Sequence, residues 1–183
     1  MFDRFLIYAR ELQGEIVFYY PFLLKWLAVF WLIFFVNVVL FKGRLNSLGI
    51  YPRRRWGLLG LIFSPFLHGS FSHLFLNSVV LFSLGLCVLI LNVHYFYIIC
   101  LIIILLGGLL TWIFGRVSIH IGASGLIMGL WGYVMLNAYV RPSLLAVIVV
   151  VVCLYYFSGL FLNLFPTDHS VSWEAHVFGF LAG

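Results

Sequence analysis

Charge is scarce in this chain. Of its 183 residues, 8% are charged and 65% are hydrophobic, whereas a soluble globular domain carries about 25% charged residues. A chain of this composition cannot bury all of its apolar surface by folding in water, so we expect lipid to be its solvent. The scarcity of charge argues against a water-soluble domain and predicts an integral membrane protein that has the lipid bilayer as a partner.

Basic residues are few and unevenly placed. The chain has ten Lys and Arg against five Asp and Glu, and half of the basic residues lie in one segment between two apolar runs: Lys42, Arg44, Arg53, Arg54 and Arg55. A nucleic-acid-binding protein needs basic surface that follows a phosphate backbone. A single cluster beside an apolar run suits lipid headgroups better, so we expect no nucleic-acid partner.

Metal-binding and redox motifs are missing as well. The three cysteines, Cys87, Cys100 and Cys153, lie inside apolar runs, where a thiol acts as a small core residue. The chain has no HExxH motif, which excludes the zinc proteases that use it, and no pair of aspartates within the apolar runs. We expect neither a metal nor a cofactor.

Long apolar runs are what the chain has instead. They predict an all-α fold, namely a polytopic transmembrane bundle of six helices. The predicted spans are Tyr20–Phe41, His73–Leu91, Tyr95–Phe114, Ser124–Val140, Leu144–Leu162 and a last helix that starts near Trp173. The sixth helix is expected to be truncated, since the eleven residues 173–183 cover about 16 Å of a hydrocarbon core about 30 Å thick.

Three regions lie outside these spans. Residues 1–19 have apolar side chains at helical spacing and predict an amphipathic N-terminal surface segment, which leaves 20–183 as the membrane domain. The long connection 42–72 contains Trp56–Phe63, which is apolar but too short to cross a bilayer, so we expect it in the interface. A polar loop, Asn163–Ser172, precedes the last helix.

Helix order alone brings several polar residues together. The second, fourth and sixth helices cross the membrane in the same direction. His73 and Asn77 open the second helix, Ser124 opens the fourth and His176 opens the sixth. These four residues are therefore expected at similar depth near one membrane face, and polar residues that meet inside a membrane are a functional-site hypothesis.

Ser124 and His176 are the candidates for nucleophile and base. Ser124 lies in the run Gly-Ala-Ser-Gly at 122–125, where small neighbours let a substrate approach and a helix start offers unpaired N–H groups. A neutral His176 can take the serine proton. Glu174 is two residues away and faces elsewhere on a helix, so the pattern indicates a dyad rather than a triad. The structural alternatives are a serine N-cap and a histidine at the headgroup level.

His73 and Asn77 are candidates for an oxyanion site. Their i, i+4 spacing places them on one helix face, and both side chains can donate hydrogen bonds. The alternative is polar contact between helices. The other histidines are assigned to interfaces or loops, with His120 ambiguous because it is four residues from Ser124: His68, His94, His120 and His169.

Small residues form a stripe on each of two helices. The stripe of the fourth helix contains Gly125, Gly129 and Gly132, and that of the sixth contains Ala175, Gly179 and Gly183. Such stripes let two helix backbones approach closely. If they face each other, Ser124 and His176 come within reach, because each is adjacent in sequence to a stripe residue.

Taken together, these motifs resemble the rhomboid family of intramembrane serine proteases in its six-helix bacterial form. The matching elements are His73-Leu-Phe-Leu-Asn77, Gly122-Ala123-Ser124-Gly125 and Ala175-His176-Val-Phe-Gly179. Two departures are Met128, where many members have an aromatic residue, and Arg55-Trp56, which reverses a Trp-Arg pair often found in the first loop.

The resemblance implies a serine endopeptidase that cleaves transmembrane segments of membrane proteins. Ser124 would be the nucleophile and His176 the base, with His73, Asn77 and the Ser124 backbone N–H as the oxyanion hole. Residues 163–172 would cap the site, and substrates would enter beside the fifth helix. The expected location is the inner membrane of a bacterium, with the site facing outside, although the basic residues of the first loop then run against the positive-inside tendency.

Two other functions compete with this reading. A non-catalytic rhomboid-like protein that binds membrane clients ranks second, because such proteins usually lack the serine or the histidine and this chain has both. A transporter or channel ranks third, because the chain shows neither inverted repeats nor charges along a path.

Overall fold

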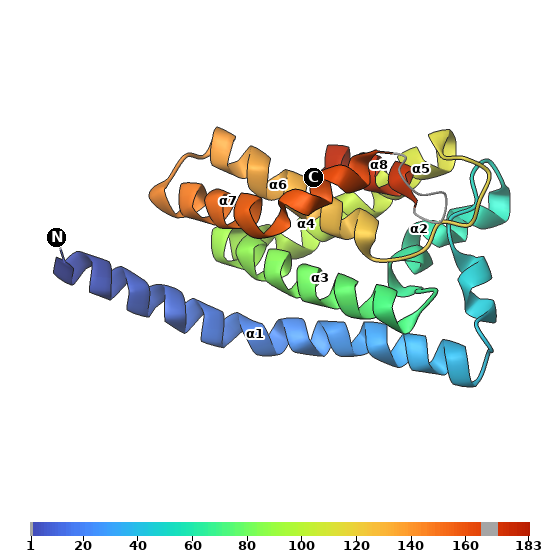
Figure 1. The fold of residues 1–183 in the computed structure, drawn as a ribbon, viewed down its shortest axis with the longest axis horizontal. Coiled ribbons are helices and arrows are strands. Elements are labelled where there is room, and N and C mark those ends of the chain that lie inside the picture. The colour runs from blue at the N-terminus through green and yellow to red at the C-terminus, as the bar shows by residue number, and fades with distance from the viewer. Residues whose placement is uncertain (1, 166–171) are drawn as a thin grey trace.

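The computed structural model describes residues 2–165 and 172–183, and the fold in these ranges is a bundle of helices. The six predicted helices correspond to α1 (Phe2–Val39), α3 (Phe71–Asn92), a run formed by α4 (Phe96–Ile102), the π-helical η5 (Ile103–Gly107) and α5 (Gly108–Phe114), then α6 (Ser124–Val140), α7 (Leu144–Phe157) and α8 (Trp173–Ala182). The predicted all-α fold is confirmed (Figure 1). Short helices fill the connections: η1 (Arg44–Leu48), η2 (Arg55–Leu59), α2 (Gly60–Phe63), η3 (Ser64–Phe66), η4 (Val93–Tyr95) and η6 (Ser158–Leu164).

Three helical stretches of the described chain are long and apolar enough to cross a membrane: Gln13–Val39, Phe71–Phe114 and Leu144–Leu162. The second of these is 44 residues long and contains a turn. At Asn92 the backbone leaves helical geometry, with φ −156° and ψ 68°, and α4 returns along α3 (Figure 1). It therefore supplies two passes, and Ser124–Val140 is a further, shorter apolar helix.

The first helix differs from the sequence prediction. α1 continues from Phe2 to Val39 through Pro21, without the break that we placed between residues 19 and 20. Proline removes one backbone hydrogen bond, but a helix can pass through it with a bend. The surface position of residues 1–19 stays a prediction.

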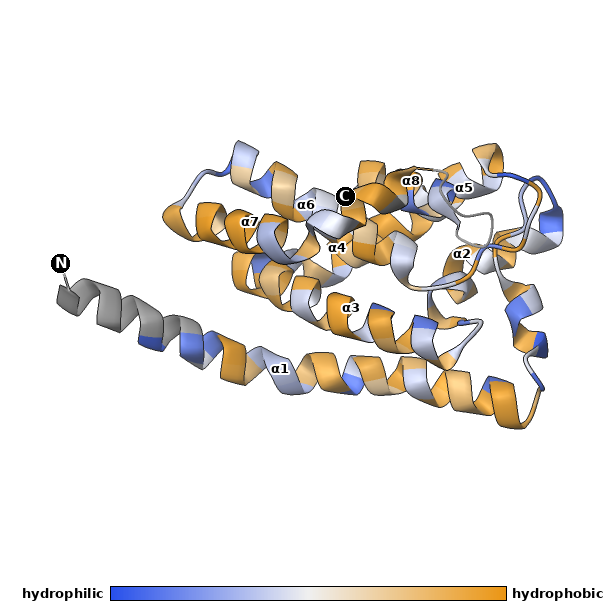
Figure 2. Cartoon of the chain, in the orientation of Figure 1, coloured by the Kyte–Doolittle hydropathy of each residue, from blue (hydrophilic) through white to orange (hydrophobic). Residues whose placement is uncertain are grey.

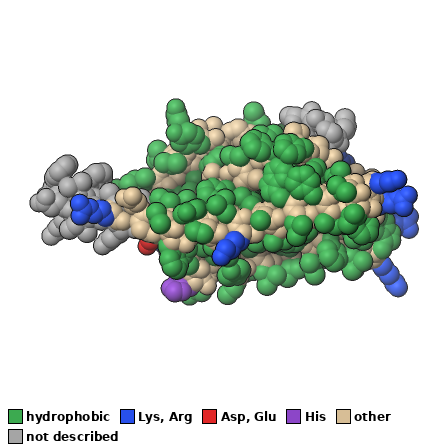
Figure 3. All heavy atoms as spheres, turned by 90° about the horizontal axis from the view of Figure 1, so that it is seen from below, with side chains coloured by type: hydrophobic (Ala, Val, Ile, Leu, Met, Phe, Trp, Pro, Cys, Tyr) green, Lys and Arg blue, Asp and Glu red, His purple; other side chains and the backbone are tan. Residues whose placement is uncertain are grey.

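The core of the bundle lies around α6. This helix is buried on several sides, because α3, α7, α8 and η5 all pack against it. Its buried residues include Met128, Leu130, Trp131 and Val134. By contrast, α1 packs along α3, with Leu23 seated against Gly85. The periphery is largely apolar: hydrophobic colour predominates on α3, α7 and the coloured part of α1 in Figure 2, and hydrophobic side chains are spread over the face of the bundle drawn in Figure 3. This is the surface that a bundle presents to lipid.

The predicted contact between the two small-residue stripes is confirmed. A side-chain carbon placed on Gly179 would overlap the carbonyl oxygen of Gly125, and one placed on Gly183 would overlap that of Gly129. A carbon on Gly125 would lie 3.2 Å from the carbonyl oxygen of Ala175. The helices α6 and α8 therefore meet backbone to backbone, as small-residue stripes allow.

Candidate active site

The structure brings all four predicted site residues to one cavity. His73 and Asn77 come from α3, Ser124 from the first position of α6, and His176 from the first turns of α8. The cavity has a volume of about 640 Å³, and its wall also includes Ser70, Met128, Leu160 and Ser172. The starts of the three helices therefore converge, as their parallel direction predicts.

The backbone before Ser124 is shaped by Gly122. This residue has φ +115°, a conformation that L side chains rarely adopt. A side-chain carbon there would also lie 2.8 Å from Cε1 of His73. The Gly122 N–H donates to the carbonyl of Ser64 at 2.9 Å, which holds the turn in place. Glycine is thus required both for the turn that presents Ser124 and for the close approach of His73.

The first turn of α3 is positioned by a serine cap. Ser70 is the N-cap residue, and its hydroxyl accepts a hydrogen bond from the His73 N–H at 3.2 Å. One turn later, Asn77 lies on the same side of the helix and reaches the same cavity. Both side chains thus face the space in front of Ser124.

His68 is a part of this site that sequence reasoning missed. The sequence predicts a loop or interface position for His68; it does lie in a loop, but it is buried, with 2% of its surface exposed. Its Nε2 accepts a hydrogen bond from the Ala123 N–H at 3.3 Å and lies 3.1 Å from Nδ2 of Asn77. Burial, helped by the nearby His73 and opposed by a hydrogen bond with the Phe66 backbone, lowers the pKa of His68 to about 4. A neutral His68 therefore orients the Asn77 amide and fixes the residue before Ser124.

His120, whose role the sequence leaves ambiguous, is a buried residue of the loop between α5 and α6. Its backbone forms an isolated bridge with Ile50, which joins the loop before Ser124 to the segment after α1. Its Nε2–H donates to the carbonyl of Arg116 at 3.0 Å, and its Nδ1 contacts the hydroxyl of Ser172. Burial lowers the pKa of His120, while the Arg116 carbonyl and the charge of Glu174 oppose this shift.

Glu174 is directed away from the cavity, as predicted. Its carboxylate accepts a hydrogen bond from the Arg116 N–H at 3.3 Å and lies 3.6 Å from Nε of the same residue. His94 is exposed in the turn after α3, in agreement with its assignment to a loop. His169 and most of the predicted cap, 163–172, lie outside the described residues.

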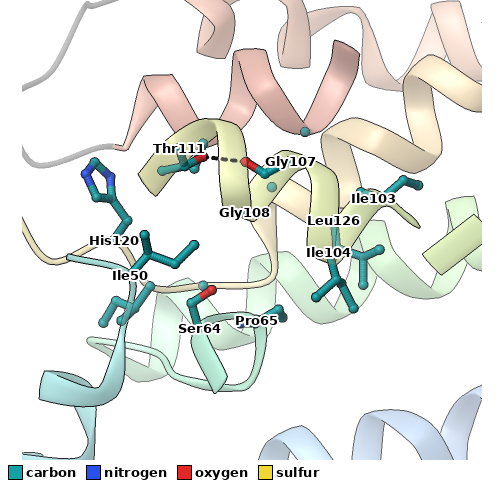
Figure 4. A pocket seen from close by; sticks show the side chains of 15 residues that line it. Ile50, Ser64, Pro65, Ile103, Ile104, Gly107, Gly108, Thr111, His120 and Leu126 are labelled. Carbon is teal, nitrogen blue, oxygen red and sulfur yellow. Dashed lines mark hydrogen bonds between the residues drawn. The ribbon is translucent and has the colours of Figure 1, made fainter. Parts of the chain in front are cut away.

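A second, smaller cavity of about 40 Å³ lies behind the loop that leads to Ser124. Figure 4 shows Ser64 and His120 on its wall, together with Thr111, whose hydroxyl donates to the Gly107 carbonyl at 2.8 Å. Among the residues that the structure describes, no three His, Cys, Asp or Glu side chains are grouped so that they could hold a metal ion. The polar side chains on the wall of the larger cavity are three serine hydroxyls, two imidazoles and an amide.

Comparison with known proteins supports the family resemblance that the sequence motifs indicate. The family model of the Rhomboid domain matches residues 55–183. Uncharacterized proteins of Mycobacterium bovis and Mycobacterium tuberculosis are each 37% identical over 151 residues, which cover 77% of this chain and 62% of the relative. An uncharacterized protein of Mycobacterium leprae is 27% identical over 171 residues, covering 88% of this chain and 67% of the relative. The chain thus spans 62% of the length of the first of these relatives.

Proposed function

Because the chain belongs to the rhomboid family and is a multi-pass integral membrane protein, we propose that it is an intramembrane serine endopeptidase that cleaves transmembrane segments of other membrane proteins. The observation that carries this proposal is the convergence of Ser124, His176, His73 and Asn77 on one cavity. A serine and a histidine from separate helices, with two further hydrogen-bond donors, are the parts that acyl transfer requires.

The proposed reaction begins when the Ser124 hydroxyl attacks the carbonyl carbon of the scissile peptide bond. His176 takes the hydroxyl proton as the bond forms, and then gives it to the departing amine. The negative charge on the carbonyl oxygen is stabilised by N–H groups of His73, Asn77 and the Ser124 backbone. Water, activated by His176, then hydrolyses the acyl-serine and restores the free hydroxyl.

We further propose that the protein lies in the plasma membrane of a bacterium with its cavity facing outside. The basic segment lies at the cavity end of the bundle, because Ile50, between Arg44 and Arg53, bridges to His120 in the loop before Ser124. Labelling of single cysteines on intact cells tests this orientation. Ser47→Cys, at the exposed cavity end, should react with an impermeant maleimide, whereas Pro142→Cys, in the exposed turn after α6, should react only after lysis. The reverse pattern would invert the orientation.

The activity itself is tested by cleavage of a transmembrane substrate in detergent or lipid vesicles. Ser124→Ala and His176→Ala should each abolish cleavage, because the first removes the nucleophile and the second its base. His73→Ala or Asn77→Ala should only reduce it, since loss of one oxyanion donor costs about 2.7–4 kcal/mol of transition-state stabilisation. Undiminished cleavage by Ser124→Ala would end the protease proposal, and a parent protein that binds membrane clients without cleaving them would favour the non-catalytic alternative.

A further inference from the structure

The loop that leads into Ser124 and the first turn of α8, which carries His176, are joined by a partly buried ion pair. The backbone N–H and the Nε of Arg116 both approach the same carboxylate oxygen of Glu174, at 3.3 Å and 3.6 Å. Glu174 is 4% exposed, whereas the side chain of Arg116 is 32% exposed. The glutamate carboxylate is therefore buried, whereas the arginine side chain is partly exposed at the protein surface.

A second connection runs beside this ion pair. The Nε2–H of His120 donates to the carbonyl of Arg116 at 3.0 Å, which leaves Nδ1 free to accept a hydrogen bond from the hydroxyl of Ser172. Ser172 is the N-cap residue of α8. The same loop therefore contacts both the first residue before α8 and the second residue within it.

Stability alone gives little reason for a glutamate in this place. Burial of a charge is costly, and a buried ion pair often contributes no net stability compared with an apolar replacement. In addition, Oε2 of Glu174 makes no hydrogen bond with any described residue. The position of the pair in the chain offers a better reason, because Arg116 lies in the loop that leads to Ser124 and Glu174 lies two residues before His176.

The glycine contact between α6 and α8 brings the two helices close but does not by itself fix the register of the start of α8, which an ion pair there can fix. Backbone-to-backbone contact at Gly125 and Gly179 sets how closely the two helices approach. Gly125 and Gly179 have no side chains that could interlock, and the ring contact between Trp131 and Phe180 lies near the other end of α8, whereas it is side-chain knobs in holes that define register. A directed contact at the start of α8 can supply that register.

The geometry points to Glu174 as a positioning residue that holds the start of α8, and hence His176, in register with Ser124. Arg116 is its direct partner, and the His120–Ser172 contact supports the same junction. This inference rests on the proposed function, because it assigns Glu174 a role in aligning the proposed dyad. Glu174 itself touches no reacting atom.

The first test is the cleavage kinetics of Glu174→Gln. This change keeps the shape of the side chain and an oxygen that can accept from the Arg116 N–H, but it removes the charge. A displacement near 1 Å costs on the order of a hundredfold in rate, so a partial loss of register should lower kcat by about tenfold while KM stays within about twofold. Thermal unfolding should change little. Glu15→Gln, at an exposed glutamate on α1, is the matched control and should leave kcat unchanged.

A double variant shows whether the effect passes through Arg116. If Glu174 acts by holding Arg116, then Arg116→Gln combined with Glu174→Gln should be no slower than either single variant, because contacts that act as one unit are not additive. Multiplied losses, or an unchanged kcat in folded Glu174→Gln, would overturn the inference.

A crosslinking measurement tests the register without relying on proteolysis. Ser124→Cys and His176→Cys are combined in a protein whose native cysteines are replaced by alanine, and the rate of disulfide formation with copper phenanthroline is followed. Adding Glu174→Gln should slow crosslinking several-fold, whereas adding Glu15→Gln should not. Equal rates with and without Glu174→Gln overturn the inference. If the cysteine pair crosslinks as expected but the protein with Ser124 and His176 intact cleaves no substrate, the proposed function is refuted instead, so the two failures are distinct.

Discussion

Two walls of the cavity are built in different ways. On one side, α6 and α8 meet through glycines, and no side chain fits between Gly179 and Gly125. On the other side, Leu160 of η6 lines the cavity, and the neighbouring Gly159 has no atom within 4 Å of the position where its side chain would begin. The helix before it, α7, exposes large apolar residues such as Val151 and Tyr155.

This difference indicates that one wall positions the serine and the histidine, whereas the other suits the entry of substrates. A wall made of backbone contacts has no side chains that can move aside, so it suits the serine and histidine, whose separation must be held within a fraction of an ångström. A wall made of side chains on an otherwise exposed helix can repack at lower cost. Entry of substrates beside α7, which the family resemblance implies, stays a prediction and fits this second kind of wall.

The largest expected effect comes from adding the same side chain to each wall. Gly179→Val should abolish cleavage, by about a hundredfold or more, because its added carbons overlap the Gly125 carbonyl and push α8 away from α6. Gly159→Val meets open space and should keep most of the activity. Cleavage rates of folded, monodisperse variants decide the matter. If both variants cleave like the parent, then the glycine contact does not set the geometry of the dyad.

A smaller change on the same wall should have a graded effect. Gly107 of η5 also contacts α8, and a side-chain carbon there would lie 3.2 Å from Cα of Gly179. Such a contact is a few tenths of an ångström too close, so Gly107→Ala should shift α8 slightly and reduce cleavage several-fold without abolishing it. Assays of Gly107→Ala beside Gly179→Val would show this ranking, and a greater loss in Gly107→Ala would contradict it.

The pH dependence of stability tests the role of His68, in the loop whose contact with Ala123 supports the start of α6. His68 has a pKa of about 4 in the folded protein against 6.5 for an unperturbed histidine. Below pH 6.5 His68 becomes protonated in the unfolded chain but stays neutral in the folded protein. The free energy of unfolding therefore falls as the pH drops toward 4, by up to about 3 kcal/mol. His68→Gln keeps an acceptor for the Ala123 N–H but does not titrate.

The measurement for His68 is thermal unfolding at pH 7.5 and pH 5. The parent should be the more stable protein at pH 7.5, and its advantage over His68→Gln should shrink at pH 5. Other groups that titrate in this range, such as His120, are common to both proteins and cancel in the difference. An advantage that stays constant between the two pH values would show that His68 is not held neutral by burial.

The smallest effect is expected where α8 faces away from α6. Leu181 is 68% exposed, so Leu181→Val removes one methylene from the periphery and leaves the glycine contact intact. Cleavage should stay within about twofold of the parent, because exposed substitutions away from such contacts change stability by about 0.5 kcal/mol or less. A large loss here would mean that activity depends on helix surfaces in general rather than on the glycine wall.

The sequence was sufficient to predict the helices and the meeting of the four site residues. Apolar runs determine the number of passes, and the alternating direction of those passes places the starts of α3, α6 and α8 at the same end. The stripes of small residues at Gly125 and Gly179 then indicated which helices touch. All of these inferences rest on periodic patterns, which sequence displays directly.

The connections could not be predicted in the same way, because their conformations have no period. His68 and His120 are buried only because the loops fold back, through the positive φ of Gly122 and the bridge between Ile50 and His120. The spacing of His68, five residues before His73, was the one available signal for the first. Likewise, the change of composition near residue 20 marked a boundary in polarity but not the end of a helix, since α1 runs through Pro21.

The central claim, that Ser124 is a nucleophile activated by His176, is tested most directly by a covalent probe. The purified protein is treated with a fluorophosphonate, which reacts with activated serine hydroxyls, and the modified residue is identified by mass spectrometry of its peptides. We predict a single adduct on Ser124 that disappears in Ser124→Ala and forms far more slowly in His176→Ala. An adduct on a different serine, no adduct at all, or an undiminished rate in His176→Ala would contradict the claim.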